Sequence, residues 1–99
     1  MKYKIGDKVR IKLLVQIIEE FGTDGEGGAI CQSDFPKNME KDLNSRVPSR
    51  ILTIMDITKS YYIVKEMGWS WSDDMIECLA KEYVAPVSIR NRFEIMDLD

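Results

Sequence analysis

Hydrophobic and charged side chains alternate along the first twelve residues of the chain. A period of two is typical of a β-strand that turns one face toward a core. Gly6-Asp7 interrupts the alternation and predicts a turn or bulge, after which the pattern resumes. We therefore predict a strand over residues 3–11. Its apolar face carries Tyr3, Ile5, Val9 and Ile11, and its basic face carries Lys4, Lys8, Arg10 and Lys12.

Three stretches in the second half of the chain also favour strands. Residues 51–57, ILTIMDI, are apolar on both faces, which indicates a central strand. Residues 61–67, YYIVKEM, follow a turn and predict the second strand of a hairpin. Residues 68–72, GWSWS, continue the sheet with both indoles on one face. A helical turn over 73–76 is expected next, capped by Ser72.

The last alternating stretch, residues 87–95, predicts a C-terminal strand whose apolar face requires a cover. Pro86 separates this strand from the segment before it. Pairing within the chain's own sheet gives a monomer, which we favour, whereas pairing with a second copy gives a homodimer. The apolar face carries Val87, Ile89, Phe93 and Ile95.

Two segments carry the spacing of helices. Residues 33–43, SDFPKNMEKDL, predict a short helix with one apolar stripe, formed by Phe35, Met39 and Leu43. Residues 13–21 are ambiguous, because their apolar residues have helical spacing but several of them are β-branched. We predict an extended segment there, ending in a turn at Phe21-Gly22. Several short strands with one short helix predict a mainly β protein, a small barrel.

Composition adds limits to this picture. A length of 99 residues indicates a single domain spanning 1–99. Hydrophobic residues make up 44% and charged residues 31%, the balance of a globular protein. The longest apolar run, LLVQII at 13–18, is too short for a membrane span, and the N-terminus does not resemble a signal peptide. We expect a cytoplasmic protein.

The residue types argue against catalysis. The chain has no histidine, so the usual general base and a common metal ligand are missing. The glycine-rich stretch at 22–28 lacks the Lys-Ser/Thr ending of a phosphate loop and indicates a mobile acidic loop. Cys31 and Cys78 are interpreted as small buried hydrophobic residues, with a disulfide or a reactive thiol as alternatives. We expect no enzyme activity, no cofactor and no metal.

Four motifs follow one another along residues 2–78: KYKIGDKVRIK, LTIMDI, YYIVKE and WSWSDDMIE. Together they resemble a family of small bacterial and phage proteins of unassigned function. The resemblance implies a Src-homology-3-like (SH3-like) barrel and a bacterial host cell, but neither an activity nor a catalytic residue. The chain departs from that family in residues 13–28, which are more apolar, and in residues 79–99, which extend past its usual end.

Trp69 and Trp71 stand one residue apart and are followed at once by acids. In SH3-like barrels, exposed aromatic side chains beside acids form a groove for peptides or cations. We interpret Trp71 as core, whereas Trp69 stays open between core and binding site. One of two adjacent tyrosines must face outward and can complete the groove. The candidate partner-binding residues are Trp69, Tyr61, Tyr62, Asp73, Asp74, Glu19 and Glu20.

The function that these residues favour is a non-enzymatic module that binds another protein. An alternative is a phage counter-defence inhibitor, similar to anti-CRISPR proteins, that blocks a host nuclease or other host enzyme. Acids at 19–34 and 73–77 would then imitate phosphates, and residues 13–18 would add apolar contact. RNA binding by the basic first strand is a weaker alternative, because a net charge of -3 argues against nucleic acid as a partner.

Overall fold

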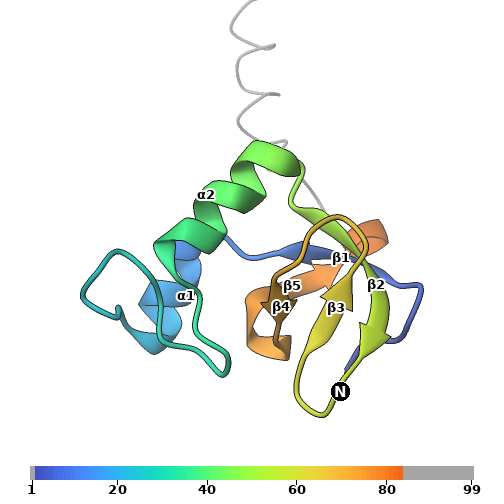
Figure 1. Cartoon of the computed structure of the whole chain (residues 1–99), viewed down its shortest axis with the longest axis horizontal. Coiled ribbons are helices and arrows are strands. Elements are labelled where there is room, and N and C mark those ends of the chain that lie inside the picture. The colour runs from blue at the N-terminus through green and yellow to red at the C-terminus, as the bar shows by residue number, and fades with distance from the viewer. Residues whose placement is uncertain (1, 84–99) are drawn as a thin grey trace, which may run out of the picture.

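A five-stranded antiparallel sheet lies beside two α-helices in the computed structural model, which describes residues 2–83 (Figure 1). The order of the strands across the sheet is β4-β3-β2-β1-β5. The strands are β1 (Lys8–Ile11), β2 (Ile51–Ile57), β3 (Tyr62–Val64), β4 (Ser70–Trp71) and β5 (Ile76–Leu79). The helices are α1 (Leu14–Phe21) and α2 (Lys37–Arg46), and two 3-10 turns are η1 (Asp73–Met75) and η2 (Ala80–Glu82).

The sheet is open, so the prediction of a mainly β, SH3-like barrel with one short helix is wrong. Within residues 2–83, β4 and β5 form the two edges and do not pair with each other. β4 has only two residues, which supply too few backbone groups to close a barrel. Turn η1 then carries the chain to the opposite edge, where β5 pairs with β1. Two helices complete a mixed α/β fold.

The first strand is shorter than predicted. It begins at Lys8, because a tight turn precedes it: the N–H of Asp7 donates to the carbonyl oxygen of Lys4 at 3.0 Å. Gly6 has a φ of 96° in this turn, a conformation that glycine adopts without strain. The predicted alternation is confirmed within β1, where Val9 and Ile11 are buried.

Residues 14–21 form helix α1, so the predicted extended segment is wrong. Ile17 is completely buried in the core, and Leu14 and Ile18 pack against its margin. Oε1 of Gln16 accepts a hydrogen bond of 2.8 Å from the N–H of Leu13, which supports the first helical turn. Burial of this stripe outweighs the preference of β-branched residues for strands, since helices in proteins are stabilised mainly by packing.

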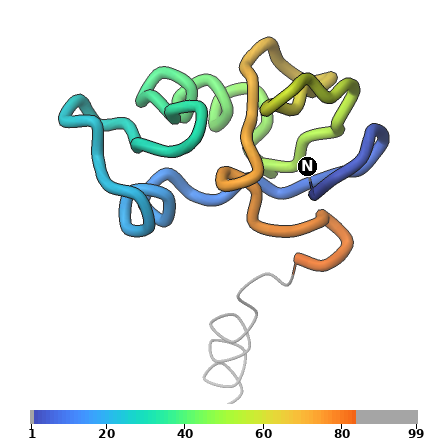
Figure 2. The backbone as a smooth tube through the Cα atoms, turned by 90° about the horizontal axis from the view of Figure 1, so that it is seen from below, coloured from blue at the N-terminus to red at the C-terminus, as the bar shows by residue number. Residues whose placement is uncertain are grey.

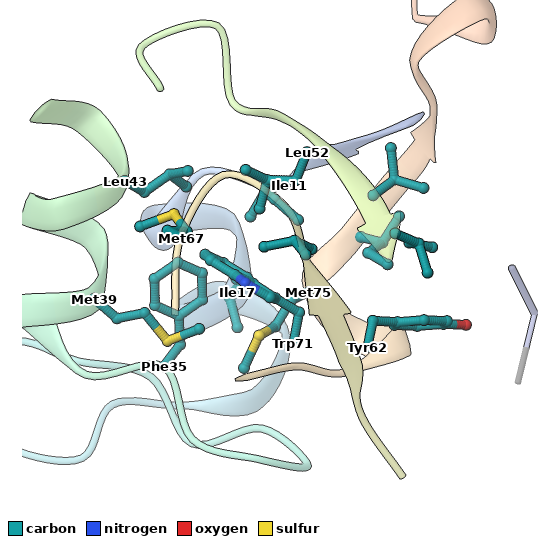
Figure 3. Close-up of a cluster of buried hydrophobic side chains, with 14 of the residues drawn as sticks. Ile11, Ile17, Phe35, Met39, Leu43, Leu52, Tyr62, Met67, Trp71 and Met75 are labelled. Carbon is teal, nitrogen blue, oxygen red and sulfur yellow. The ribbon is translucent and has the colours of Figure 1, made fainter. Parts of the chain in front are cut away.

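The predicted second helix is confirmed, although α2 begins at Lys37 instead of near Ser33. Its predicted stripe is buried: Phe35, Met39 and Leu43 all lie in the core. The ring of Phe35 meets the indole of Trp71 edge to face, with centroids 5.7 Å apart. Figure 3 shows these side chains between α2 and the sheet, so one core joins the helices to the strands.

The predicted strands at 51–57, 61–67 and 68–72 are confirmed as β2, β3 and β4, with β3 and β4 shorter than expected. β2 is central, between β3 and β1. Strand β5 was not predicted, because its sequence, IECL, is too short to show a clear period. The predicted C-terminal strand at 87–95 lies outside the described residues.

Candidate functional site

The two tryptophans have different environments. Trp71 is completely buried at the centre of the core, as predicted (Figure 3). Trp69 packs partly against the same core, and its indole Nε1 donates a hydrogen bond of 2.8 Å to Oδ2 of Asp42 in α2. Trp69 therefore joins β4 to α2. The indole N–H is already hydrogen-bonded within the fold, so Trp69 is a weaker candidate for a residue that binds a partner.

Tyr62 and Asp73, two predicted site residues, belong to a buried network. Tyr62 is completely buried, and its hydroxyl donates a short hydrogen bond to Asp73 and accepts one of 2.9 Å from the N–H of Tyr3. Burial, with the Asp73 hydrogen bond, raises the pKa of Tyr62 to about 12. Tyr61 is the exposed member of the tyrosine pair. The network holds the N-terminal segment against η1.

Asp74 is likewise engaged in the fold. Its Oδ2 accepts a hydrogen bond of 2.7 Å from the N–H of Gln32, which lies 42 residues away in the chain. Its Oδ1 accepts a short hydrogen bond from the hydroxyl of Ser72. The predicted capping of η1 by Ser72 is therefore wrong, because this hydroxyl bonds a side chain instead. Tyr62 and Asp73 are joined directly, whereas Trp69 bonds to Asp42 and Asp74 to Gln32, so these residues are parts of the scaffold.

A different surface exposes apolar side chains. We call residues 13–30, which comprise α1 and the loop after it, the α1 arm. Figure 1 shows it at one end of the molecule, away from the sheet. Four of its large hydrophobic side chains are about half exposed: Leu13 by 43%, Val15 by 56%, Phe21 by 42% and Ile30 by 50%. Sequence analysis proposed residues 13–18 as an apolar contact of the inhibitor alternative but did not single out Phe21 or Ile30.

The exposed apolar residues of the α1 arm are linked by its geometry. Ile18, which packs partly against the core, stands three residues from both Val15 and Phe21, so the three form a row along the helix of which the two ends are exposed. The N–H of Ile30 donates a hydrogen bond of 2.9 Å to the carbonyl oxygen of Gly22, directly after Phe21. The row therefore continues toward the loop.

Acids lie around this row, and residues 13–30 contain no base, but Nζ of Lys12, just before them, lies 5.9 Å from the centroid of the Phe21 ring. Glu20 pairs with Lys12, with 3.0 Å between Oε1 and Nζ. Glu19 is exposed one helical turn after Val15. Asp24 orders the glycine-rich loop, because its Oδ1 accepts hydrogen bonds of 2.7 Å and 3.0 Å from the N–H groups of Glu26 and Gly28. Of the predicted site residues, Glu19 and Glu20 therefore lie on this apolar and acidic surface.

A cavity of about 520 Å³ lies between the N-terminal turn and β5. Its acids are engaged: Asp7 accepts from the N–H of Lys4, Glu82 from the N–H of Leu79, and Glu77 lies 3.7 Å from Nε of Arg10. Burial raises the pKa of the Cys78 thiol. These groups provide no activated nucleophile. The lining residues are Lys2, Tyr3, Lys4, Asp7, Glu77, Cys78, Leu79 and Glu82.

Both cysteines are free and partly buried, so the disulfide alternative is wrong. Burial raises the pKa of the Cys31 thiol to about 11, which opposes formation of the reactive thiolate. In the part of the chain that the structure describes, no three His, Cys, Asp or Glu side chains gather as metal ligands. Neither helix within residues 2–83 has the length and apolar character of a membrane span.

Comparison with protein-family models, with curated proteins and with solved structures finds no match to this chain.

Proposed function

We propose that this chain is a small non-enzymatic module that binds another protein through the α1 arm. The exposure of Leu13, Val15, Phe21 and Ile30 on one short segment carries the proposal. Single exposed hydrophobic residues are ordinary on protein surfaces, but apolar patches rimmed by polar residues are typical of interaction sites. The groove predicted around Trp69 is the weaker candidate, because Trp69, Tyr62, Asp73 and Asp74 bond within the fold.

The size of the apolar surface sets the strength of such binding. Burying the exposed half of each side chain contributes about 1 kcal/mol, so four of them contribute about 4 kcal/mol. Association costs about 4–15 kcal/mol in lost translational and rotational freedom, so this burial alone does not give stable binding. Tighter binding therefore requires complementary charge on the partner, and the acids of the α1 arm favour a basic one.

An inhibitor of a host nuclease or other nucleic-acid enzyme is a second candidate function. The observation that favours it is the set of acids on the α1 arm, which fits a basic site that otherwise holds phosphates. RNA binding by the basic face of β1 is a third and weaker candidate. A phage or mobile-element origin and a cytoplasmic location in a bacterial host are hypotheses that rest on sequence resemblance and composition.

Affinity capture from the cells that naturally produce the chain tests the proposal. We expect Val15→Lys to lose the captured protein, because it places a charge at the most exposed apolar side chain of the α1 arm. Tyr61→Ala is the matched control, since Tyr61 is also exposed but lies in the predicted groove. Retention of the partner by Val15→Lys together with its loss by Tyr61→Ala would place the binding site in the groove instead.

A further inference from the structure

The sheet has a second face, which points away from the core and carries apolar side chains. Ile51 and Ile63 are partly buried, yet neither packs against the core. Each is next to buried residues of its own strand, so its side chain points to the opposite face of the sheet. Met55, also in β2, is 52% exposed. We call this side of the sheet the outer face, and its members include Arg10, Ile51, Met55, Ile63 and Cys78.

Arg10 lies in the middle of the outer face. It stands opposite Ile51 of β2 and Cys78 of β5, and residues directly opposite each other point to the same face. Its Nη2 donates a hydrogen bond of 3.2 Å to the hydroxyl of Tyr83, and its Cζ lies 4.0 Å from the centroid of the Tyr83 ring. In Figure 2 the orange end of the described chain passes along the blue first strand, on the side opposite the green helix α2. Tyr83 therefore brings the chain over the outer face.

The guanidinium of Arg10 is incompletely paired within residues 2–83. Its Nε and Nη1 are buried, and no group of the described residues accepts a hydrogen bond from them. Oε1 of Glu77 lies 3.7 Å from Nε, which is close enough for charge attraction but too far for a hydrogen bond. Buried donors are nearly always paired, because an unpaired one loses its hydration without compensation. Arg10 therefore requires an acceptor from outside residues 2–83.

Residues 84–99 continue from Tyr83 and are long enough to cross the outer face. Five strands about 4.8 Å apart span about 20 Å, a distance that about six extended residues cover. The alternation in residues 87–95 predicts an apolar face that requires a cover. The outer face presents apolar side chains that do not pack against the core. Each of the two surfaces can therefore cover the other.

We infer that residues 84–99 pack on the outer face of their own chain, instead of pairing at an edge of the sheet. The predicted apolar face of residues 87–95 lies on Ile51, Met55 and Ile63, and an oxygen atom of the segment accepts from Arg10. Attachment at Tyr83 favours this occupant, because a tethered segment has an effective concentration on the order of 1 mM. It also favours the face over the free edge of β5, since Tyr83 lies over Arg10 of β1.

Charge does not select the occupant of the outer face. Lys8 stands opposite Thr53, and Glu66 accepts a hydrogen bond of 2.8 Å from the hydroxyl of the same Thr53. The two charges have opposite signs and flank the apolar residues together. The inference therefore depends on apolar burial, on the unpaired Arg10 donors and on the position of Tyr83, and it is independent of the α1 arm.

Nuclear Overhauser contacts in the full chain test the inference directly. We expect contacts between the ring of Phe93 and the methyl groups of Ile51, Met55 and Ile63. A sample that mixes labelled and unlabelled chains separates contacts within one chain from contacts between two copies, and we expect them within one chain. The Nε–H of Arg10 should exchange slowly with water, because an acceptor of the segment holds it.

Phe93→Asp should remove these contacts and speed exchange of the Arg10 Nε–H about tenfold, because a carboxylate is unfavourable against apolar side chains. Ser88→Asp is the matched control, since it adds the same charge on the opposite face of the predicted strand, and it should change neither measurement. Slow exchange of the β1 backbone amides in both variants confirms that the fold is intact. An equal effect of the two variants would contradict the assigned face of the segment.

Three results for the wild-type chain would overturn the inference. Contacts of Phe93 with the outer face of a second copy would make the occupant another molecule of the chain. Backbone contacts between residues 87–95 and β5 would show an added edge strand. Absence of contacts, with rapid exchange of the Arg10 Nε–H, would show that residues 84–99 leave the outer face open. None of these results concerns the α1 arm, so the proposed function is tested separately.

Discussion

The indole of Trp69 donates a hydrogen bond of 2.8 Å to Asp42, a residue 27 positions earlier in the chain. The contact joins the short strand β4 to helix α2. Asp42 also accepts a hydrogen bond of 2.8 Å from Nε of Arg46, one turn further along α2. Trp69 is thus a link between the sheet and the helices.

We predict that Trp69→Ala lowers the free energy of unfolding by about 2 kcal/mol, because it removes a partly buried indole. Trp69→Phe should lower it less, since the ring remains and only the N–H is lost. Denaturant unfolding of the two variants measures the difference. If Trp69→Ala is as stable as the wild-type chain but no longer binds a partner, Trp69 belongs to the predicted binding groove and not to the scaffold.

The stability that the hydrogen bond between Trp69 and Asp42 gives to the fold depends on pH. The hydrogen bond from Trp69, with that from Arg46, holds the pKa of Asp42 below its usual range. A lowered pKa in the folded state stabilises the fold above the usual carboxylate range, and this stabilisation disappears as the pH falls. We expect Trp69→Phe to raise the pKa of Asp42 toward its ordinary value. NMR titration of the Asp42 carboxyl in the wild-type chain and in Trp69→Phe measures this change in pKa. An unchanged pKa would contradict the role of the Trp69 hydrogen bond.

A buried ion pair fixes α2 to β1. Nη2 of the buried Arg50 lies 2.8 Å from Oε1 of Glu40, and Nε of Arg50 donates to the carbonyl oxygen of Ile11 at 3.2 Å. We predict that Glu40→Gln lowers the free energy of unfolding by about 3 kcal/mol, because it leaves the guanidinium buried without its counter-charge. Removal of the more exposed pair between Lys12 and Glu20 by Glu20→Gln provides the control. A loss no greater than that of the control would contradict the role of the buried pair.

Tyr62 predicts a loss of stability at alkaline pH. Its pKa is raised to about 12 by burial and by the hydrogen bond to Asp73. In the folded chain the pKa of Tyr62 is above its usual value of about 10. Tyr62 therefore stabilises the fold fully below a pH of about 10, and this stabilisation is lost as the pH rises toward 12. Tyr62→Phe should weaken the decline. Denaturant unfolding at several alkaline pH values tests this, and an identical decline in the variant would refute it.

Cys31 is predicted to react slowly in the folded chain. With a pKa of about 11 in place of 9.0, its thiol is ionised about 100-fold less at mildly alkaline pH. A more basic thiolate is also a stronger nucleophile, which offsets part of the loss in reaction rate. The reaction with a disulfide reagent should therefore slow about tenfold. The variant Cys78→Ser isolates the signal of Cys31. Equal rates in the folded and the denatured chain would contradict the burial of this thiol.

The elements that repeat a clear period could be predicted from the sequence. The stripe of α2 and the alternation in β1 identify their elements, because each places its apolar residues on one face. Helix α1 could not be recognised, since Ile17 and Ile18 favour strands locally and only contact with the core decides between the two. The openness of the sheet follows from the two-residue length of β4, which no local pattern indicates.

The candidate site depended still more on contacts between distant residues. Trp69 beside two acids is typical of a binding groove, but its bond to Asp42 and the bond of Asp74 to Gln32 connect positions far apart in the chain. Glu19 and Glu20 were included for their charge alone. Residues 13–18 were proposed as an apolar contact, but because they were assigned to an extended segment, the helical row that joins Val15 to Phe21 was not predicted.

Amide hydrogen exchange, with and without the bound partner, tests the binding role of the α1 arm most directly. The measurement reports each backbone N–H, so it separates the arm from the groove predicted around Trp69 without any substitution. We predict that binding slows exchange in residues 13–30 and leaves residues 61–74 unchanged. Slower exchange in residues 61–74, with residues 13–30 unchanged, would contradict the proposal.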